Sequence, residues 1–407
     1  MKVALIHDYL KEFGGAERVL RVLADMYPDA PIYTAFKVKN STAGKAFSDR
    51  KIIESWLAPI LKIWKLYSPL RFLIPAIWGS MSAKGGSAYG RDLSDYDLVI
   101  TSASWYITRG FKVGKNTKVI CYCHTPPRWL YGYETSVGFT KYWPVKIYSA
   151  IVGHFLRMYD FKMAQPVIRE KSRSKFRAGV DIFIANSENV KSRIEKFYRR
   201  DSVVIYPPVD VERIRSQTSE VGSQREEYFL IVARLVGAKG LEAAVKAFSR
   251  RSKSHPKDGQ LLADKYNLKI VGEAHGFSDV QSKISKVKSA NIEFLGRVSD
   301  EKLWELYAKA KGFIALSRDE DFGMTPVEAQ AAGTPVIAFN GGGYKESVLP
   351  GVTGLLINDT DEKTITEAIE RFEKIKWDKK KLQENAMRFS KERFEKEMKK
   401  LVSSIMN

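Results

Sequence analysis

The stretch that decides the fold, residues 312–339, reads "GFIALSRDEDFGMTPVEAQAAGTPVIAF". It opens with an apolar run that predicts a buried strand ending at Ser317, and it closes with a second apolar run, "TPVIAF". Between them, the residues from Thr325 onward predict a helix with Pro326 at its first position. A strand, a helix and a second strand in this order are typical of a parallel sheet covered by helices.

Apolar runs of this kind recur along the chain, each followed by a segment of helical length: "KVALIH", "YDLVIT", "TKVICYCH", "DIFIANS", "SVVIYPP", "YFLIVAR", "LKIVGE" and "IEFLG". They predict an α/β fold with two doubly wound Rossmann-like domains, because 407 residues exceed what one core organises. The pattern restarts after Pro207 and Pro208. We place the first domain at residues 1–206, the second at 207–385, and at 386–407 a C-terminal helix that returns to pack on the first domain.

The composition is that of a globular chain with few cysteines. Only Cys121 and Cys123 are present, and we interpret them as reduced thiols, because a zinc site would need further Cys and His residues. No secretory segment follows Met1, so we expect a cytoplasmic protein. No uncharged apolar stretch reaches the roughly 20 residues that cross a bilayer.

The positive charge is concentrated in the first half of the chain. Residues 1–200 hold 33 Lys or Arg and 16 Asp or Glu, a net charge of +17, whereas residues 201–407 hold 34 and 31, a net charge of +3. Such asymmetry favours an anionic membrane surface or a nucleic acid as partner, or else a solvated basic surface. No recognised nucleic-acid module is present, so we expect no nucleic-acid partner.

One basic and aromatic stretch, "SWLAPILKIWKLYSPLRFLIPAIWGSMSAK" at residues 55–84, favours the membrane. Ile60, Ile63, Trp64 and Tyr67 would share a helical face, with two lysines roughly opposite. Prolines stop any continuous span, as expected of an element that lies in the membrane interface. The alternative is a core helix followed by a loop.

The loop and helix of residues 317–328 predict a ligand site. We expect Glu320 above the sheet and Glu328 on the helix, with the amides of Gly323, Met324 and Thr325 between them. Carboxylates accept paired hydrogen bonds from vicinal hydroxyls, whereas amides and the helix dipole favour phosphate. A nucleotide sugar carries both groups.

Other candidates follow predicted strands, where ligands of doubly wound sheets bind. Arg234 and Lys239 would converge on one loop and suit a diphosphate, unless they are surface charges. His124 ends a strand, although a lone histidine is more often a packed core residue. Gly14 and Gly15 open a helix whose amides would face an anion, or they form only a turn.

The segment "EDFGMTPVE" matches the E-x7-E signature of the retaining glycosyltransferases of GT-B family 4. The chain resembles this family elsewhere too, in "HDYLKEFGGAERVL", "CYCHTPPRWLY", "DIFIANSENVKSRIEKFY", "FLGRVSDEKLWELYAKAKGFIALS" and "GTPVIAFNGGGYKESV". Within it, the chain is most similar to mannosyltransferases that build O-antigen and other surface glycans. The resemblance implies a GT-B fold, with two Rossmann-like domains that face each other across a cleft.

The resemblance also implies a role for each candidate residue. The donor diphosphate is expected at Arg234, Lys239, Gly14, Gly15, Met324 and Thr325, the donor sugar at Glu320, Gly323, Met324 and His124, and the ribose and base at Glu328, Arg297 and Val298. Glu320 and His124 would be the catalytic residues. One departure, "VGEAHGF" at residues 271–277, stands where many relatives have a Gly-Asp-Gly-Pro turn and leaves nearby contacts open.

The resulting functional prediction is a retaining hexosyltransferase that needs no metal and no cofactor beyond its nucleotide-sugar donor. GDP-mannose is the predicted donor, with UDP-glucose as the alternative. The acceptor would be a glycan or a polyprenyl- or dolichyl-linked sugar, and the enzyme would be peripheral on the inner face of the plasma membrane. An epimerase or a phosphorylase of the same architecture would need paired catalytic acids or a pyridoxal-phosphate lysine, which we do not find.

Overall fold

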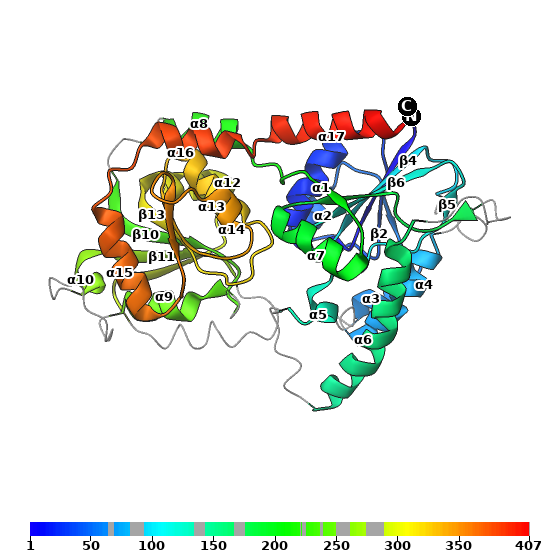
Figure 1. The fold of residues 1–407 in the computed structure, drawn as a ribbon, viewed down its shortest axis with the longest axis horizontal. Helices are drawn as coiled ribbons and strands as arrows, with labels where there is room; N and C mark the ends of the chain where they lie inside the picture. The colour runs from blue at the N-terminus through cyan, green and yellow to red at the C-terminus, as the bar shows by residue number, and fades with distance from the viewer. Residues whose placement is uncertain are drawn as a thin grey trace. The chain divides into compact units, whose positions relative to one another are not determined.

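The computed structural model shows two compact α/β units (Figure 1). Of the described residues, the first unit holds 1–208 and 394–406, and the second holds 209–393. The described residues are 1–63, 69–81, 93–133, 143–166, 176–219, 221, 225–236, 239–249, 261–273 and 289–406.

The first unit is built on a parallel sheet of seven strands in the order β3-β2-β1-β4-β6-β8-β9. Its strands are β1 (Val3–His7), β2 (Ile32–Thr34), β3 (Ile52–Glu54), β4 (Leu98–Ala103), β6 (Lys118–Cys123), β8 (Ile182–Ala185) and β9 (Ser202–Val204). A separate antiparallel pair joins β5 (Val113–Gly114) to β7 (Phe176–Arg177). The strands are almost continuously apolar because helices cover both faces of the sheet.

The helical elements of the first unit are α1 (Gly15–Met26), α2 (Thr42–Ala46), α3 (Ala58–Lys62), η2 (Pro69–Leu73), α4 (Ile74–Gly79), α5 (Arg128–Tyr131), α6 (Trp143–Ala164) and α7 (Glu188–Tyr198). The last helix, α17 (Lys391–Met406), also packs here from Phe394 onward. Its residues Phe394, Met398 and Val402 are buried in the same cluster as Tyr122. Because these residues recur every four positions, one face of α17 covers the sheet.

The second unit is built on six parallel strands in the order β12-β11-β10-β13-β14-β15. They are β10 (Glu226–Val232), β11 (Asn267–Val271), β12 (Ile292–Gly296), β13 (Ala310–Ala315), β14 (Val336–Phe339) and β15 (Gly354–Ile357). The helices are α8 (Val211–Ser219), α9 (Leu241–Ala247), α10 (Leu262–Lys265), α12 (Asp300–Lys309), α13 (Met324–Ala331), α14 (Tyr344–Ser347), α15 (Glu362–Glu373) and α16 (Lys379–Met387).

The predicted fold class is confirmed, since both sheets are parallel and doubly wound. One local prediction is wrong: α13 begins at Met324 with Gly323 as its N-cap, so Pro326 is the third helical residue. Proline is tolerated there because the first amides of a helix have no intrahelical acceptor.

The predicted interfacial helix within residues 55–84 is also corrected. Helix α3 ends at Lys62, and Ile63 is extended, so no helical face continues through Ile63. Trp64 and Tyr67 lie outside the described residues. In the described part of the chain, no helix has both the length and the hydropathy needed to cross a membrane.

Candidate functional site

The second unit brings Lys239, Glu320 and Tyr344 together where its strands end. Lys239 lies just before α9, Glu320 follows β13, and Tyr344 begins α14. Lys239 Nζ donates to Glu320 Oε2 in an ion pair, and the Tyr344 hydroxyl lies 3.3 Å from the same carboxylate oxygen. The side chains of Lys239 and Glu320 remain 21% and 18% exposed, so a ligand can reach them.

Two glycines allow the loops around this pair to approach each other. Gly323 has φ +84°, and a Cβ there would lie 2.5 Å from Cε1 of Tyr344. Gly342 has φ +54°, and a Cβ there would lie 2.2 Å from the carbonyl oxygen of Glu320. Both positions require glycine, for backbone conformation and for space. The loops after β13 and β14 are therefore held in contact around Glu320.

The N-cap of α13 is Gly323, which has no side chain to bond to the first amides of the helix. The first amides of the helix, at Met324 and Thr325, are of the kind left without intrahelical acceptors, and the helix dipole favours an anion near them. Phosphate oxygens suit such a position.

Glu328 lies one turn further along α13 and is 8% exposed. The hydroxyl of Tyr307, on α12, donates to Glu328 Oε2 over 3.1 Å. A buried carboxylate needs such donors, and its second oxygen can accept hydrogen bonds from a vicinal diol.

The remaining candidate residues of this unit lie just after the ends of other strands. Arg234 follows β10 and is exposed, and Arg297 and Val298 follow β12. The amide of Gly272 donates to the carbonyl of Gly296 over 2.8 Å, which ties the ends of β11 and β12 together. The described contacts include none between Arg234 and Lys239, and residues 237–238 lie outside the described residues.

In the first unit, four side chains form a polar chain that ends at His124. His124 Nε2 lies 2.8 Å from Ser102 Oγ, which lies 3.0 Å from His7 Nδ1. His7 Nε2 in turn lies 3.3 Å from Glu17 Oε1. His7 ends β1, Ser102 belongs to β4 and His124 follows β6, and these strands are adjacent in the sheet. The chain therefore runs along the carboxyl edge.

The pKa values of the two histidines in this hydrogen-bonded series are shifted in opposite directions. Burial would lower the pKa of His7, but the hydrogen bond and the charge of Glu17 outweigh it and raise that pKa above its ordinary value. Burial and the charge of His7 lower the pKa of His124 to about 3. His124 is therefore a neutral imidazole at physiological pH, and it can donate or accept one hydrogen bond at each nitrogen.

The state of His7 sets the direction of hydrogen bonding along the chain. When His7 is protonated, both its nitrogens donate, so Ser102 accepts from His7 and donates to His124 Nε2. The proton of His124 is then on Nδ1. When His7 is neutral with its proton directed at Glu17, the direction reverses and His124 carries its proton on Nε2.

The two glycines stand at the start of α1, where the sequence predicted that they open a helix. Gly14 is the N-cap and Gly15 the first helical residue. The amide of Gly14 donates to Glu17 Oε2 over 2.9 Å, so the carboxylate of Glu17 already serves this helix end and His7 together. An incoming phosphate would have to compete with that carboxylate.

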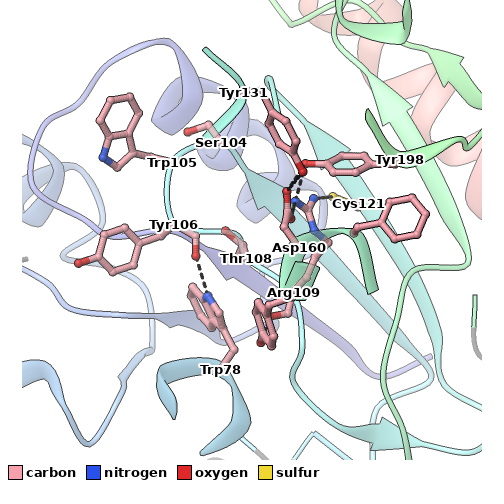
Figure 2. A network of polar contacts seen from close by, with 12 residues as sticks. Trp78, Ser104, Trp105, Tyr106, Thr108, Arg109, Cys121, Tyr131, Asp160 and Tyr198 are labelled. Carbon is pink, nitrogen blue, oxygen red and sulfur yellow. Dashed lines mark hydrogen bonds and ion pairs between the residues drawn. The ribbon is translucent and has the colours of Figure 1, made fainter. Parts of the chain in front are cut away.

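A second polar network of the first unit, around Arg109, is buried (Figure 2). Arg109 pairs with Asp160, and Tyr131 and Tyr198 donate to Asp160 Oδ2 over 2.8 Å and 2.9 Å. Arg109 also reaches the sulfur of Cys121 over 3.6 Å. Burial raises the pKa of the Cys121 thiol, and neither Cys121 nor Cys123 forms a disulfide. We interpret the network as structural, since it joins α6 to the sheet.

Metal ligands are not gathered at either site. In the part of the chain that the structure describes, no group of three His, Cys, Asp or Glu residues is arranged to hold a metal ion. Lys239, Arg234 and the first amides of α13 are among the cationic and donor groups at the strand ends of the described part of the second unit.

The second unit was compared with known protein families. Residues 212–389 match the family of glycosyl transferases group 1. Most of the second unit is therefore similar to that family. The matched segment contains Lys239, Glu320, Glu328 and Tyr344, and therefore the whole cluster at the strand ends of that unit.

Individual relatives are glycosyltransferases that match about half of this chain. An uncharacterised glycosyltransferase of Methanocaldococcus jannaschii is 28% identical over 52% of this chain and 55% of its own length. The O-antigen chain mannosyltransferase RfbU of Salmonella typhimurium is 31% identical over 46% of this chain and 50% of its own length. The chain thus spans about half the length of these curated relatives.

Solved structures are similar over the full length. The HepE protein of Anabaena in complex with UDP-glucose has a TM-score of 0.61 at 18% identity and covers 99% of this chain and 100% of its own. This likeness establishes the GT-B fold for both units.

Several residues of the candidate site were not predicted. In the second unit, Tyr344 and Tyr307 contact the two glutamates. In the first unit, Ser102, His7 and Glu17 continue the hydrogen-bonded series that begins at His124. The "GGGY" run after β14 was a usable signal, because three glycines after a strand indicate close approach of backbones. The partners of His124 had no local signal.

Proposed function

We propose that the protein is a retaining glycosyltransferase that moves a hexose from a nucleotide sugar to a hydroxyl group. The ion pair of Lys239 and Glu320, close to the glycine N-cap of α13, carries this proposal. It offers a cation and amides for the diphosphate and a carboxylate for sugar hydroxyls within one loop cluster. The group 1 match of this segment supports the same conclusion.

The donor assignment follows from the chemistry of each group. Lys239, Arg234 and the amides of Met324 and Thr325 would hold the diphosphate, and Glu328 the ribose hydroxyls. Arg297 and Val298 would lie against the base. Because Glu320 is paired with Lys239, the diphosphate must replace Glu320 as the partner of the Lys239 ammonium. The released carboxylate can then accept hydrogen bonds from the sugar hydroxyls.

The transfer itself needs stabilisation of the leaving diphosphate. The acceptor oxygen forms a bond to C1 of the sugar while the bond from C1 to the β-phosphate oxygen breaks, and its electron pair stays on the nucleoside diphosphate. The acceptor proton passes to a phosphate oxygen of the leaving group. Lys239, Arg234 and the α13 amides are preorganised donors for the growing negative charge. Attack from the same face would retain the configuration at C1.

For the first unit we propose the acceptor side of the reaction, with His124 near the donor sugar. A neutral His124, fixed by Ser102, would present a single defined nitrogen to a sugar hydroxyl. Gly14 and Gly15 would approach the phosphates only if Glu17 released the Gly14 amide.

Mannose from GDP-mannose is the proposed donor, and UDP-glucose is the second candidate. The mannosyltransferase among the relatives favours the first, and the UDP-glucose complex of HepE favours the second. We propose a glycan or a lipid-linked sugar as acceptor, and a peripheral position on the inner face of the plasma membrane. The basic first half of the chain supports that position.

The deciding experiment is a thermal-shift panel of GDP, UDP and ADP with their sugars. A ligand present at 100 times its dissociation constant adds about 2.7 kcal/mol to the free energy of unfolding. We expect GDP-mannose to raise the Tm most. A panel in which no nucleotide sugar changes the Tm would contradict the proposal, and release of nucleoside diphosphate without any acceptor would point to hydrolysis.

A further inference from the structure

One face of α6 exposes a continuous stripe of large apolar side chains. Its residues follow each other at spacings of three or four and are therefore on one side of the helix. Their exposed fractions lie between 38% at Phe161 and 73% at Trp143. The stripe consists of Trp143, Ile147, Ile151, Phe155, Met158 and Phe161. Soluble surfaces seldom carry so many large apolar groups in one row, and such patches mark interaction sites.

The opposite face of α6 holds the helix to the first unit. Leu156 and Ala164 are buried in the core, and Asp160 pairs with Arg109 inside the network of Figure 2. Tyr159 donates to the carbonyl of Arg109 over 3.0 Å. These contacts between α6 and the rest of the first unit involve none of the stripe residues. A partner can therefore cover the stripe while the helix stays packed.

The charges of α6 favour an anionic partner. Lys146 and Lys162 are exposed, and Arg157 is half-buried. The only acidic residue of the helix is Asp160, which is buried and paired with Arg109. Tyr148 donates to the carbonyl of Pro69, so η2, whose Phe72 is 49% exposed, lies against the same helix.

We propose that the apolar stripe of α6 is the surface by which this protein lies on an anionic phospholipid bilayer. The stripe would enter the boundary between head groups and acyl chains while its lysines contact anionic head groups. The helix lies along the membrane, because none of the described helices can span it. The inference rests on the proposed membrane position of the enzyme but on nothing that concerns its sugar donor.

The test is flotation of the full chain with vesicles of phosphatidylcholine, alone or mixed with phosphatidylglycerol. We expect binding to the mixed vesicles that weakens with salt, and little binding to the neutral ones. The double variant Ile151→Glu and Phe155→Glu should reduce the vesicle partition coefficient at least about tenfold. Both side chains are mostly exposed, so the variant should fold, which circular dichroism and the Tm will check.

The control is Val203→Glu, which places one glutamate at an exposed aliphatic position (46% exposed) on β9 of the same unit, and it is compared with the single variant Ile151→Glu as well as with the double variant. Its partition should stay within about twofold of the native value. Quenching of tryptophan fluorescence by brominated lipids locates the contact, because Trp143→Phe should reduce the quenching while binding persists.

Three outcomes would overturn the inference. In the first, the native chain does not bind vesicles. In the second, the control and the α6 variant lose vesicle binding equally. In the third, the stripe joins two copies of the chain. Sedimentation without lipid detects the last, as a dimer that the double variant dissociates. Nucleotide-sugar binding, measured without vesicles, reports the proposed transfer separately, so either proposal can fail alone.

Discussion

Lys239 and Glu320 form an ion pair, although 81 residues separate them in the chain. Each residue of the pair would therefore compete with the ligand group that its partner is expected to bind. A diphosphate that binds Lys239 must displace a carboxylate, and a sugar that binds Glu320 must replace an ammonium. Each partly buried charge stabilises the other, so we expect the pair to couple diphosphate binding at Lys239 to the release of Glu320.

The first prediction concerns Glu320→Gln. It should lower kcat about 100-fold or more, because the amide cannot accept as a carboxylate does. Affinity for the nucleoside diphosphate alone should stay equal or rise, because Lys239 no longer has a competing carboxylate. Steady-state kinetics and calorimetric titration measure the two effects. Glu367→Gln, an exposed carboxylate on α15, is the control. Equal losses in both measurements would contradict the coupling.

A second prediction separates Glu328 from Glu320. Glu328→Gln should mainly raise KM for the donor, since ribose contacts persist through the reaction. Tyr307→Phe removes the hydroxyl that orients Glu328 and should raise KM in the same direction by a smaller factor, about threefold to tenfold. A fall in kcat with unchanged KM for Glu328→Gln would show that ribose binding is not its role.

Gly323 provides a test of the loop geometry. Gly323→Ala should lower the free energy of unfolding by about 1–2 kcal/mol from its positive φ, with a further cost of about 1–3 kcal/mol from the contact with Tyr344. Gly351→Ala is the control, because Gly351 has φ +74° and no described atom within 4 Å of its Cβ position. Chemical denaturation of both variants measures the difference. Identical costs would mean that Tyr344 moves away freely.

The His7–Ser102–His124 chain predicts a specific pH dependence. The raised pKa of His7 contributes stability that is present below its unfolded pKa of about 6.5 and is lost as the pH rises through the folded pKa. The lowered pKa of His124, about 3, acts in the opposite direction: its contribution is present above pH about 6.5 and is lost as the pH falls toward 3.

Proton NMR titration of the histidine rings tests this pair directly. His124 should not titrate above pH about 4, and Glu17→Gln should lower the pKa of His7 because its main charged partner is gone. In Glu17→Gln, the free energy of unfolding should no longer fall as the pH rises through the folded pKa of His7. A His124 that titrates near 6.5 in the native chain would disprove the buried chain.

The buried pair of Arg109 and Asp160 predicts non-additive stability. Asp160→Asn should cost about 3–5 kcal/mol of unfolding free energy, because Arg109 keeps its charge without a counter-ion in the core. The double variant Arg109→Met and Asp160→Leu should cost less than the single one. Denaturant unfolding of the native chain, of Arg109→Met, of Asp160→Leu and of the double variant completes a double-mutant cycle, and additive costs would contradict the prediction.

The sequence by itself determined the fold class and the placement of several candidate residues. Apolar runs that alternate with helical segments can pack only as parallel strands covered on both faces, which puts the strand ends on one edge of each sheet. Glu320 and Glu328 follow a strand within one loop and one helix, so local spacing was sufficient to place them at that edge. The glycines at 341–343 were a further local signal of close backbone approach that did not enter the prediction.

Only the tertiary structure decided which distant groups meet there. Ser102 stands between His7 and His124 because the sheet order places β4 between β1 and β6, and no local pattern specifies that order. Tyr344 and Tyr307 reach the glutamates across separate elements. In α6, apolar residues occur on both faces, so periodicity alone cannot say which face enters the core. Asp160 and Leu156 pack into the interior of the first unit, so their face of α6 is buried and the apolar stripe on the other face is exposed.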